Sequence, residues 1–528
     1  MFTLNVPQTG KSALQHTVET RPKPTMEWLA RLPFANPVEA ARQLSMALFT
    51  LNRHVLNEDE RSGLLTLYRP VVARAASSLE TLLADAGVPP QPQQQLAGTL
   101  LRELLTEHSY GYKHVLLALT TPRFGRNPTK RIAEVTAHLL AALRDLQFAC
   151  HLTYVTPPEG LWLETHRLYQ LATTHGLADK ALEDALPAQL VYCQTLLLAL
   201  ADPPHMSRAE LAYTRLYLDK FGDLARLTPP PPDPAQNGFV IATEIDRGPG
   251  QHPPVPKDSN LWLDTDALSR HLHETAARLR SGDTPRRIGL PAGMESELSQ
   301  TLSKRLLKLW RPGAQRTFKR YPALGSAVQV VAGVSAIHRL LELVPQAAEL
   351  TVAPDEALPI SDEASVFAAP PAVNASHWTL TNDSAAGLAL TGTPDTPLNL
   401  KVGDALVLRS DDSAVWSLAV IRWIKMLETR QVELGVERLA PSIQPVWVRP
   451  LRGRRKASPE PGLFVPGLPA LHQPDRLLLP SHVYQICMDA EVWHTPRQYT
   501  VTFGRCFEHT TNYDLVDFTL LTDAPRHD

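Results

Sequence analysis

The sequence predicts a multidomain α+β protein, with an all-helical N-terminal module followed by a small antiparallel β-barrel and additional C-terminal β-strands. Residues 37–227 carry apolar side chains at three- and four-residue spacing, which is typical of amphipathic helices. From Ser326 onward the chain instead consists of short apolar and β-branched runs separated by turn residues. At 528 residues, the chain is also longer than one hydrophobic core usually serves.

The first segment, residues 1–227, is predicted to be a helical module that binds a protein partner. Asn36 is a suitable N-cap, and Pro37 at the first helical position needs no intrahelical partner for its missing N–H. The apolar pattern predicts roughly seven to nine helices joined by short turns. Two of them, around Trp162–Gly176 and Leu190–Asp202, suggest stacked helix hairpins, although the sequence shows no strict repeat.

The second segment, residues 228–309, is predicted to be a proline-rich spacer with a mixed strand and helix region. Prolines crowd Thr228–Gly238, which predicts a stiff, extended boundary between domains. A strand is expected directly after it, and helices are expected over Asp264–Arg280 and Glu295–Trp310.

The last two segments are predicted to be β-rich. Residues 310–450 contain many short strands at the spacing of a small barrel, interrupted by a long insertion with a helix-like stretch. A basic link, Arg452–Gly462, begins residues 451–528, which are expected to form a C-terminal extension or a second small barrel.

Charge and composition restrict the possible functions. The formal net charge is −2, which argues against DNA or RNA as a partner because nucleic acids require many neutralising cations. The N-terminus has no signal-peptide pattern, and no apolar run is long enough to insert into a membrane. We therefore expect a cytoplasmic protein. The scattered cysteines fit that compartment as reduced thiols: Cys150, Cys193, Cys487 and Cys506.

Arg316 and Arg320 lie four residues apart on a short linker that ends at Pro322 and precedes the first barrel strand. Two arginines at this spacing can converge on one ligand. A guanidinium group can bind phosphate oxygens or the O6/N7 edge of guanine through two hydrogen bonds, and it can stack on a purine ring.

Asn382, Ser384 and Gly387 lie where one predicted strand ends and the next begins. The Asn carboxamide and the Ser hydroxyl can hydrogen-bond a base edge, and glycine permits either a positive φ or the close approach of a ring. Asp383 lies between the two polar residues, and its carboxylate would either oppose an anionic ligand or face solvent.

Together these residues resemble the signature of the PilZ-domain family, RxxxR followed by [D/N]xSxxG, over about residues 310–445. The resemblance implies a PilZ-like barrel that binds cyclic di-GMP in bacterial second-messenger signalling, in processes such as motility or biofilm formation. Arg316 and Arg320 would contact phosphates and guanine faces, and Asn382, Ser384 and Gly387 would contact a guanine. It implies a receptor that is not an enzyme and needs no cofactor. Ligand binding would rearrange the domains for a partner.

Simpler interpretations remain open. The arginines could be solvated or ion-paired, and Asn382–Gly387 could be an ordinary hairpin turn. The alternative function is a nucleotide-free PilZ-like scaffold or adaptor whose helical module binds a protein partner. No catalytic motif is present, and no metal site is expected because His271 and His273 point to different faces of one helix.

Overall fold

The computed structural model divides into two compact units. Unit 1 comprises Met1–Ala86 and Pro90–Arg316, and unit 2 comprises Gly87–Pro89 and Thr317–Asp528. The structure describes residues 4–10, 18–121, 128–230, 238–249, 260–291, 293–294, 296–311, 321–322, 325–343, 358–359, 375–384, 387–393, 398–410, 413, 415–427, 431–452, 455–456, 458–468, 473–486, 488–494, 497–510 and 512–521.

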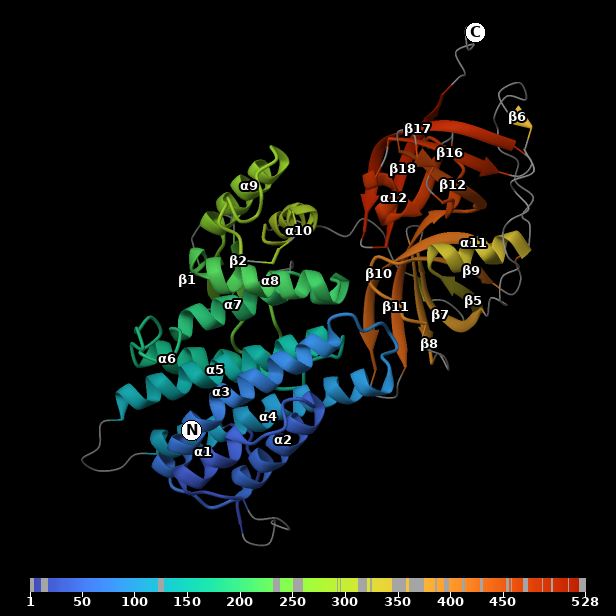
Figure 1. Cartoon of the computed structure of the whole chain (residues 1–528). Helices are drawn as coiled ribbons and strands as arrows, with labels where there is room; N and C mark the ends of the chain where they lie inside the picture. The colour runs from blue at the N-terminus through green and yellow to red at the C-terminus, as the bar shows by residue number, and fades with distance from the viewer. Residues whose placement is uncertain are drawn as a thin grey trace. The chain divides into compact units, whose positions relative to one another are not determined.

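Unit 1 begins with a helical module, shown in blue to green in Figure 1. The long helices α3, α4 and α5 pack side by side, and α2 packs against α4. The helices are α1 (Pro22–Ala30), α2 (Pro37–Arg53), α3 (Glu58–Leu83), α4 (Pro92–Thr120), α5 (Thr129–Leu152), α6 (Leu161–Thr174), α7 (Ala188–Leu200) and α8 (Arg208–Phe221). The predicted helical N-terminal module is confirmed.

Local sequence determines where several of these helices begin. The Asn36 side chain accepts a hydrogen bond from the Glu39 amide at 3.3 Å, with Pro37 as the first helical residue, as the sequence predicts. Asn57 and Ser207 begin α3 and α8 with capping boxes. Leucine and alanine side chains from all of these helices then form one continuous core.

A small sheet and two further helices complete unit 1. Strands β1 (Arg226–Thr228) and β2 (Gly238–Ile241) both pair antiparallel with β3 (Leu261–Asp264). Helices α9 (Asp266–Arg280) and α10 (Ser296–Leu309) pack on each other, and the same core extends into them.

Unit 2 contains a first barrel of six antiparallel strands in the order β7–β5–β9–β10–β11–β8. Pairing of β7 with β8 closes the ring, and the two-residue strand β4 (Tyr321–Pro322) adds to β7. The strands are β5 (Ala327–Ala332), β7 (Ser376–Ser384), β8 (Gly387–Gly392), β9 (Ala405–Ser410), β10 (Ser417–Met426) and β11 (Val432–Ala440).

The C-terminal strands form a second barrel, in the order β12–β14–β15–β18–β17–β16, which pairing of β12 with β16 closes. Two short strands, β6 (Leu358–Pro359) and β13 (Arg455–Lys456), pair with β17 and β12. A short helix, α12 (Ser481–Ile486), follows β15. The barrel strands are β12 (Gln444–Arg452), β14 (Glu460–Val465), β15 (Arg476–Pro480), β16 (Asp489–His494), β17 (Arg497–His509) and β18 (Tyr513–Leu520).

The two barrels share a hydrophobic core inside unit 2. Helix α11 (Val334–Leu343) contributes Ile337 and Leu341 to it, the first barrel contributes Val407, and the second contributes Leu463 and Leu515. Asp404 lies at the same contact, where it accepts hydrogen bonds from the Lys401 amide and the Asn512 side chain. The barrels are therefore held together by packing as well as by the chain between them.

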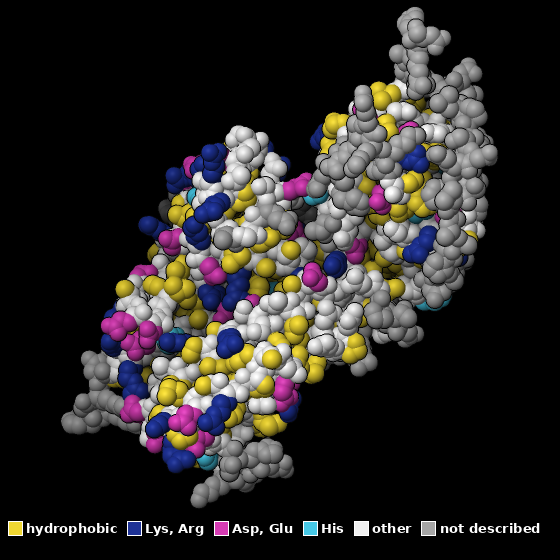
Figure 2. Space-filling view, in the orientation of Figure 1, with side chains coloured by type: hydrophobic (Ala, Val, Ile, Leu, Met, Phe, Trp, Pro, Cys, Tyr) yellow, Lys and Arg dark blue, Asp and Glu magenta, His cyan; other side chains and the backbone are white. Residues whose placement is uncertain are grey.

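The surface matches the near-neutral charge. Basic and acidic side chains alternate over the visible face, and neither sign dominates it (Figure 2). Among the described helices, none combines the length and apolar character needed to cross a bilayer. Within the described residues, no group of three or more His, Cys, Asp or Glu side chains is suited to a metal ion.

Candidate ligand site on the first barrel

The second sequence motif lies on the hairpin that closes the first barrel. Asn382 and Ser384 are at the end of β7, and Gly387 is the first residue of β8. Ser384 and Gly387 are Cα partners, and Asn382 is the partner of Ala389. Because directly opposed residues in antiparallel strands project to the same face, Asn382 and Ser384 share one face with these β8 positions.

Ser384 closes this hairpin through its hydroxyl group. The hydroxyl donates to the Gly387 carbonyl oxygen at 2.9 Å and accepts from the Gly387 amide at 3.2 Å. Ser384 therefore has the structural role of a turn residue, as one interpretation of the sequence holds. A serine oxygen has a second lone pair, so a ligand could still donate a hydrogen bond to it.

Gly387 is required by a close approach between two strands. A Cβ atom on Gly387 would lie 2.3 Å from the carbonyl oxygen of Val436 on β11. Gly387 does not have a positive φ. The sequence suggested two reasons for a glycine here, a positive φ or the close approach of a ring. The prediction of a positive φ is wrong, and the close neighbour in the structure is the backbone of β11.

The Asn382 side chain carries an unsatisfied polar atom near the turn of the hairpin. Its carbonyl oxygen Oδ1 is buried and accepts no hydrogen bond within the described part of the chain. A buried amide oxygen without a donor is unfavourable by about 1–3 kcal/mol. A ligand that donates to this oxygen would remove that cost.

Asp383 does not leave an uncompensated negative charge beside the hairpin. Its carboxylate forms an ion pair with the Arg438 guanidinium of β11 at 3.3 Å, and both side chains are partly exposed. Of the two alternatives for Asp383, the structure therefore favours a neutralised, solvent-facing carboxylate.

Trp423 belongs to the same face, and sequence reasoning did not identify it. The register runs from Asn382 to Ala389, then to Gly435 on β11 and to Trp423 on β10. The indole lies over Gly435 so closely that a Cβ atom there would overlap it, at 1.7 Å from Nε1. The small side chain of Ala389 therefore separates the Asn382 amide from the half-buried Trp423 ring, which covers Gly435. Such a surface suits a flat heterocyclic base.

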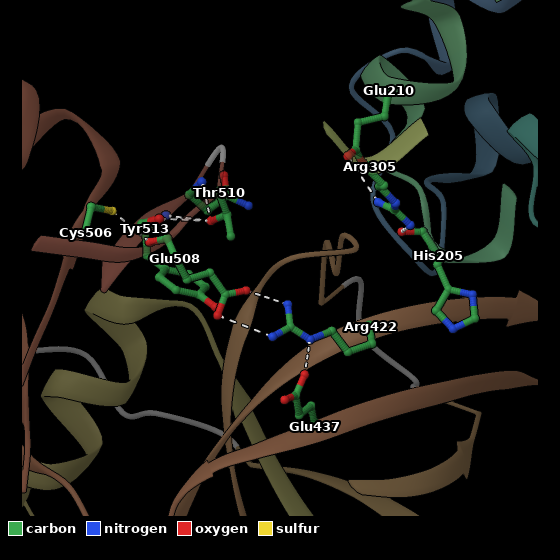
Figure 3. A network of polar contacts seen from close by, with 10 residues as sticks. His205, Glu210, Arg305, Arg422, Glu437, Cys506, Glu508, Thr510 and Tyr513 are labelled. Atoms are coloured by element: carbon green, nitrogen blue, oxygen red, sulfur yellow. Dashed lines mark hydrogen bonds and ion pairs between the residues drawn. The ribbon is translucent and has the colours of Figure 1, made fainter. Parts of the chain in front are cut away.

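A second row on this face ends in a charged network. Ser384 pairs with Gly387, which pairs with Glu437 on β11. Arg422 of β10 donates from Nε to Glu437 Oε2 at 2.6 Å and from Nη2 to Glu508 Oε2 at 3.3 Å, and its Nη1 donates to Glu508 Oε1 (Figure 3). Burial lowers the pKa of Arg422, but the ion pairs with Glu508 and Glu437 outweigh burial and raise it above its ordinary value.

Arg316 and Arg320, the other half of the predicted site, lie outside the described residues. The chain immediately after them is described: Tyr321 of β4 is the partner of Asp383, and Pro322 is the partner of Asn382. Of the predicted site, the structure thus brings Asn382, Ser384 and Gly387 together.

The chain matches three family models in sequence. Residues 23–233 match the N-terminal domain of the cyclic-di-GMP receptor FimW, residues 239–342 and 360–445 match its middle PilZ domain, and residues 446–521 match its C-terminal β-barrel domain. The middle model thus includes β2, β3, α9 and α10, which the structure groups with unit 1.

A relative in Pseudomonas aeruginosa, the cyclic-di-GMP receptor FimW, is 26% identical to this chain. The match covers 92% of this chain and 88% of the relative. No solved structure matches. The family models, the ordered motifs and the closed six-stranded barrel agree, and the chain therefore contains a domain of the PilZ family.

Proposed function

We propose that this protein is a cytoplasmic cyclic di-GMP receptor of bacterial second-messenger signalling, and that it binds its ligand without catalysing a reaction. The name of the relative and the three matching models support the ligand class. Binding would use Arg316, Arg320, Asn382, Ser384 and Gly387, together with Trp423.

One observation carries the proposal: β4 pairs with β7 at Asn382 and Asp383. Arg320 is covalently joined to Tyr321, the first residue of β4, and consecutive Cα atoms are about 3.8 Å apart. In sequence, the RxxxR motif therefore directly precedes the strand that pairs beside the buried, unpaired oxygen of Asn382. This connection supports one ligand held from both motifs.

The first prediction concerns the affinity for the nucleotide. Calorimetric titration of the intact chain with cyclic di-GMP is expected to show saturable binding that Arg316→Ala, Arg320→Ala and Asn382→Ala each weaken about tenfold or more. Each substitution removes a charged or otherwise unsatisfied hydrogen-bonding group, and about 1.4 kcal/mol corresponds to tenfold.

Arg270→Ala is the matched control, because Arg270 is a well-exposed arginine on α9 of unit 1. It should leave the affinity unchanged. Absence of any binding heat and of any change in tryptophan fluorescence with the intact chain would contradict the receptor function. The nucleotide-free adaptor would then be the better description.

A second prediction concerns the output of binding. We expect the ligand to order the linker before β4 and to change the orientation of the barrel relative to the helical module, which would then present a different surface to a protein partner. Small-angle X-ray scattering should show a change in the radius of gyration on saturation with cyclic di-GMP. Identical scattering curves with and without ligand would contradict the rearrangement.

A further inference from the structure

Glu437 lies at the edge of the proposed ligand site. It is the Cα partner of Gly387, which is the partner of Ser384, so the three residues form one row across β11, β8 and β7. Adjacent strands lie about 4.8 Å apart, so this row spans about 10 Å, which is wide enough for a purine base. Its middle position carries no side chain.

The Glu437 carboxylate has one oxygen held and one available. Oε2 accepts from Arg422 Nε at 2.6 Å, whereas Oε1 accepts no hydrogen bond from any residue that the structure describes. The side chain is about half exposed, at 47%. It can therefore be reached by a ligand that lies over Gly387.

Arg422 gives this carboxylate its orientation and offsets part of its charge. A bare carboxylate would repel a nucleotide with two phosphates, and the guanidinium bound to Oε2 reduces that repulsion while leaving Oε1 open. Arg422 is in turn held by both carboxylate oxygens of Glu508. Glu508 is on β17 of the second barrel, and its side chain is 18% exposed.

The chemistry of guanine fits this arrangement. Its Watson–Crick edge carries two donors, N1–H and the N2 amino group, and a carboxylate is an acceptor-only group. Adenine presents an acceptor at N1, which would face the carboxylate lone pairs. A correctly placed glutamate therefore favours guanine over adenine.

We propose that Glu437 recognises the guanine edge of the bound nucleotide, and that the second barrel completes the site by holding Arg422 through Glu508. Glu437 contacts the ligand, and Arg422 and Glu508 are positioning residues. This inference rests on the proposed function. It gives the second barrel a role in ligand discrimination.

The test compares cyclic di-GMP with cyclic di-AMP by calorimetry on the full chain. Glu437→Gln is expected to weaken cyclic di-GMP binding about tenfold and to leave cyclic di-AMP binding unchanged or improved, because the amide offers one acceptor and one donor. Glu433→Gln is the matched control, since Glu433 lies on the same strand, opposite Thr391, away from the Gly387 row. It should change neither affinity.

Glu508→Gln tests the contribution of the second barrel. It is expected to reduce the preference for cyclic di-GMP over cyclic di-AMP several-fold, whereas a purely structural role would lower both affinities together or neither. The intact chain separates the two hypotheses. If it does not bind cyclic di-GMP, the receptor function and this inference both fail. If it binds and Glu437→Gln keeps the full preference, only this inference is overturned.

Discussion

Acidification from pH 7 to about pH 4 is expected to unfold the helical module through four buried or half-buried histidines. Burial lowers the pKa values of His108, His114, His138 and His151 from 6.5 to about 4. The Nε2 atoms of His108, His114 and His151 are buried and have no hydrogen-bond partner among the described residues. The folded state therefore holds these rings neutral.

The sign of the effect follows from the direction of these shifts. The unfolded chain takes up protons at about pH 6.5, whereas the folded chain resists protonation until about pH 4. The stability they contribute is complete above pH 6.5 and is lost as the pH falls towards 4. For His108 and His151 the loss is about 3 kcal/mol each, at about 1.4 kcal/mol per pH unit, which is a large part of a typical folding free energy of 5–15 kcal/mol.

Hydrogen exchange of peptides from α4 and α5, measured on the full chain between pH 7 and 4, would follow the loss of stability of the helical module. His108→Gln should reduce the proton uptake on unfolding by about one over this range. His273→Gln, at an exposed position of α9, should leave proton uptake unchanged. Equal proton uptake in the His108→Gln variant and the intact chain would show that the buried ring does not drive the transition.

Gly387→Ala is expected to destabilise the first barrel by about 2–3 kcal/mol, since the substitution introduces a severe clash. The new Cβ atom would lie 2.3 Å from the Val436 carbonyl oxygen, which is backbone in the middle of β11. Relief of the clash requires β8 to move away from β11, with loss of the ladder bonds between them.

Chemical denaturation followed by tryptophan fluorescence would measure this change in the free energy of unfolding. Gly63→Ala is the matched control, because Gly63 is inside α3 and the added carbon would have no neighbour within 4 Å other than the nearby backbone of its own helix. Replacement of an unhindered helical glycine by alanine is expected to stabilise by about 0.5–1 kcal/mol. If Gly387→Ala leaves the free energy of unfolding unchanged, β8 and β11 are free to separate and the prediction is wrong.

Much of the architecture could be predicted because its determinants are local. The Asn36 cap, the helical period of residues 37–227 and the turn residues between short strands are each readable within a few residues. The helix-like stretch in the long insertion is likewise α11. For the same reason, the residue types of Asn382–Gly387 were enough to assign this motif to a hairpin.

The positions of Trp423 and Glu437 beside the ligand motif could not be predicted from local sequence, because they depend on strand register. Trp423 is about forty residues from Asn382 in sequence and reaches its row only through the pairings β10–β11, β11–β8 and β8–β7. Register is a property of the closed barrel, and a slip of one residue would reverse every side chain. Gly435 lies two residues before Glu437, but its position opposite Trp423 is set by that register and cannot be read from the sequence.

The β7–β8 hairpin carries the ligand motif and also closes the first barrel. Retention of this motif in a related sequence is therefore not sufficient evidence of ligand binding. A descendant that no longer responds to the nucleotide would still need Ser384 to hold the turn and Gly387 to admit Val436. Ser384 and Gly387 would therefore be retained under selection for folding alone. Loss of ligand binding would instead appear first as substitutions at Asn382, Arg316 and Arg320. The amide oxygen of Asn382 accepts no hydrogen bond from the described residues, so folding alone would not preserve it.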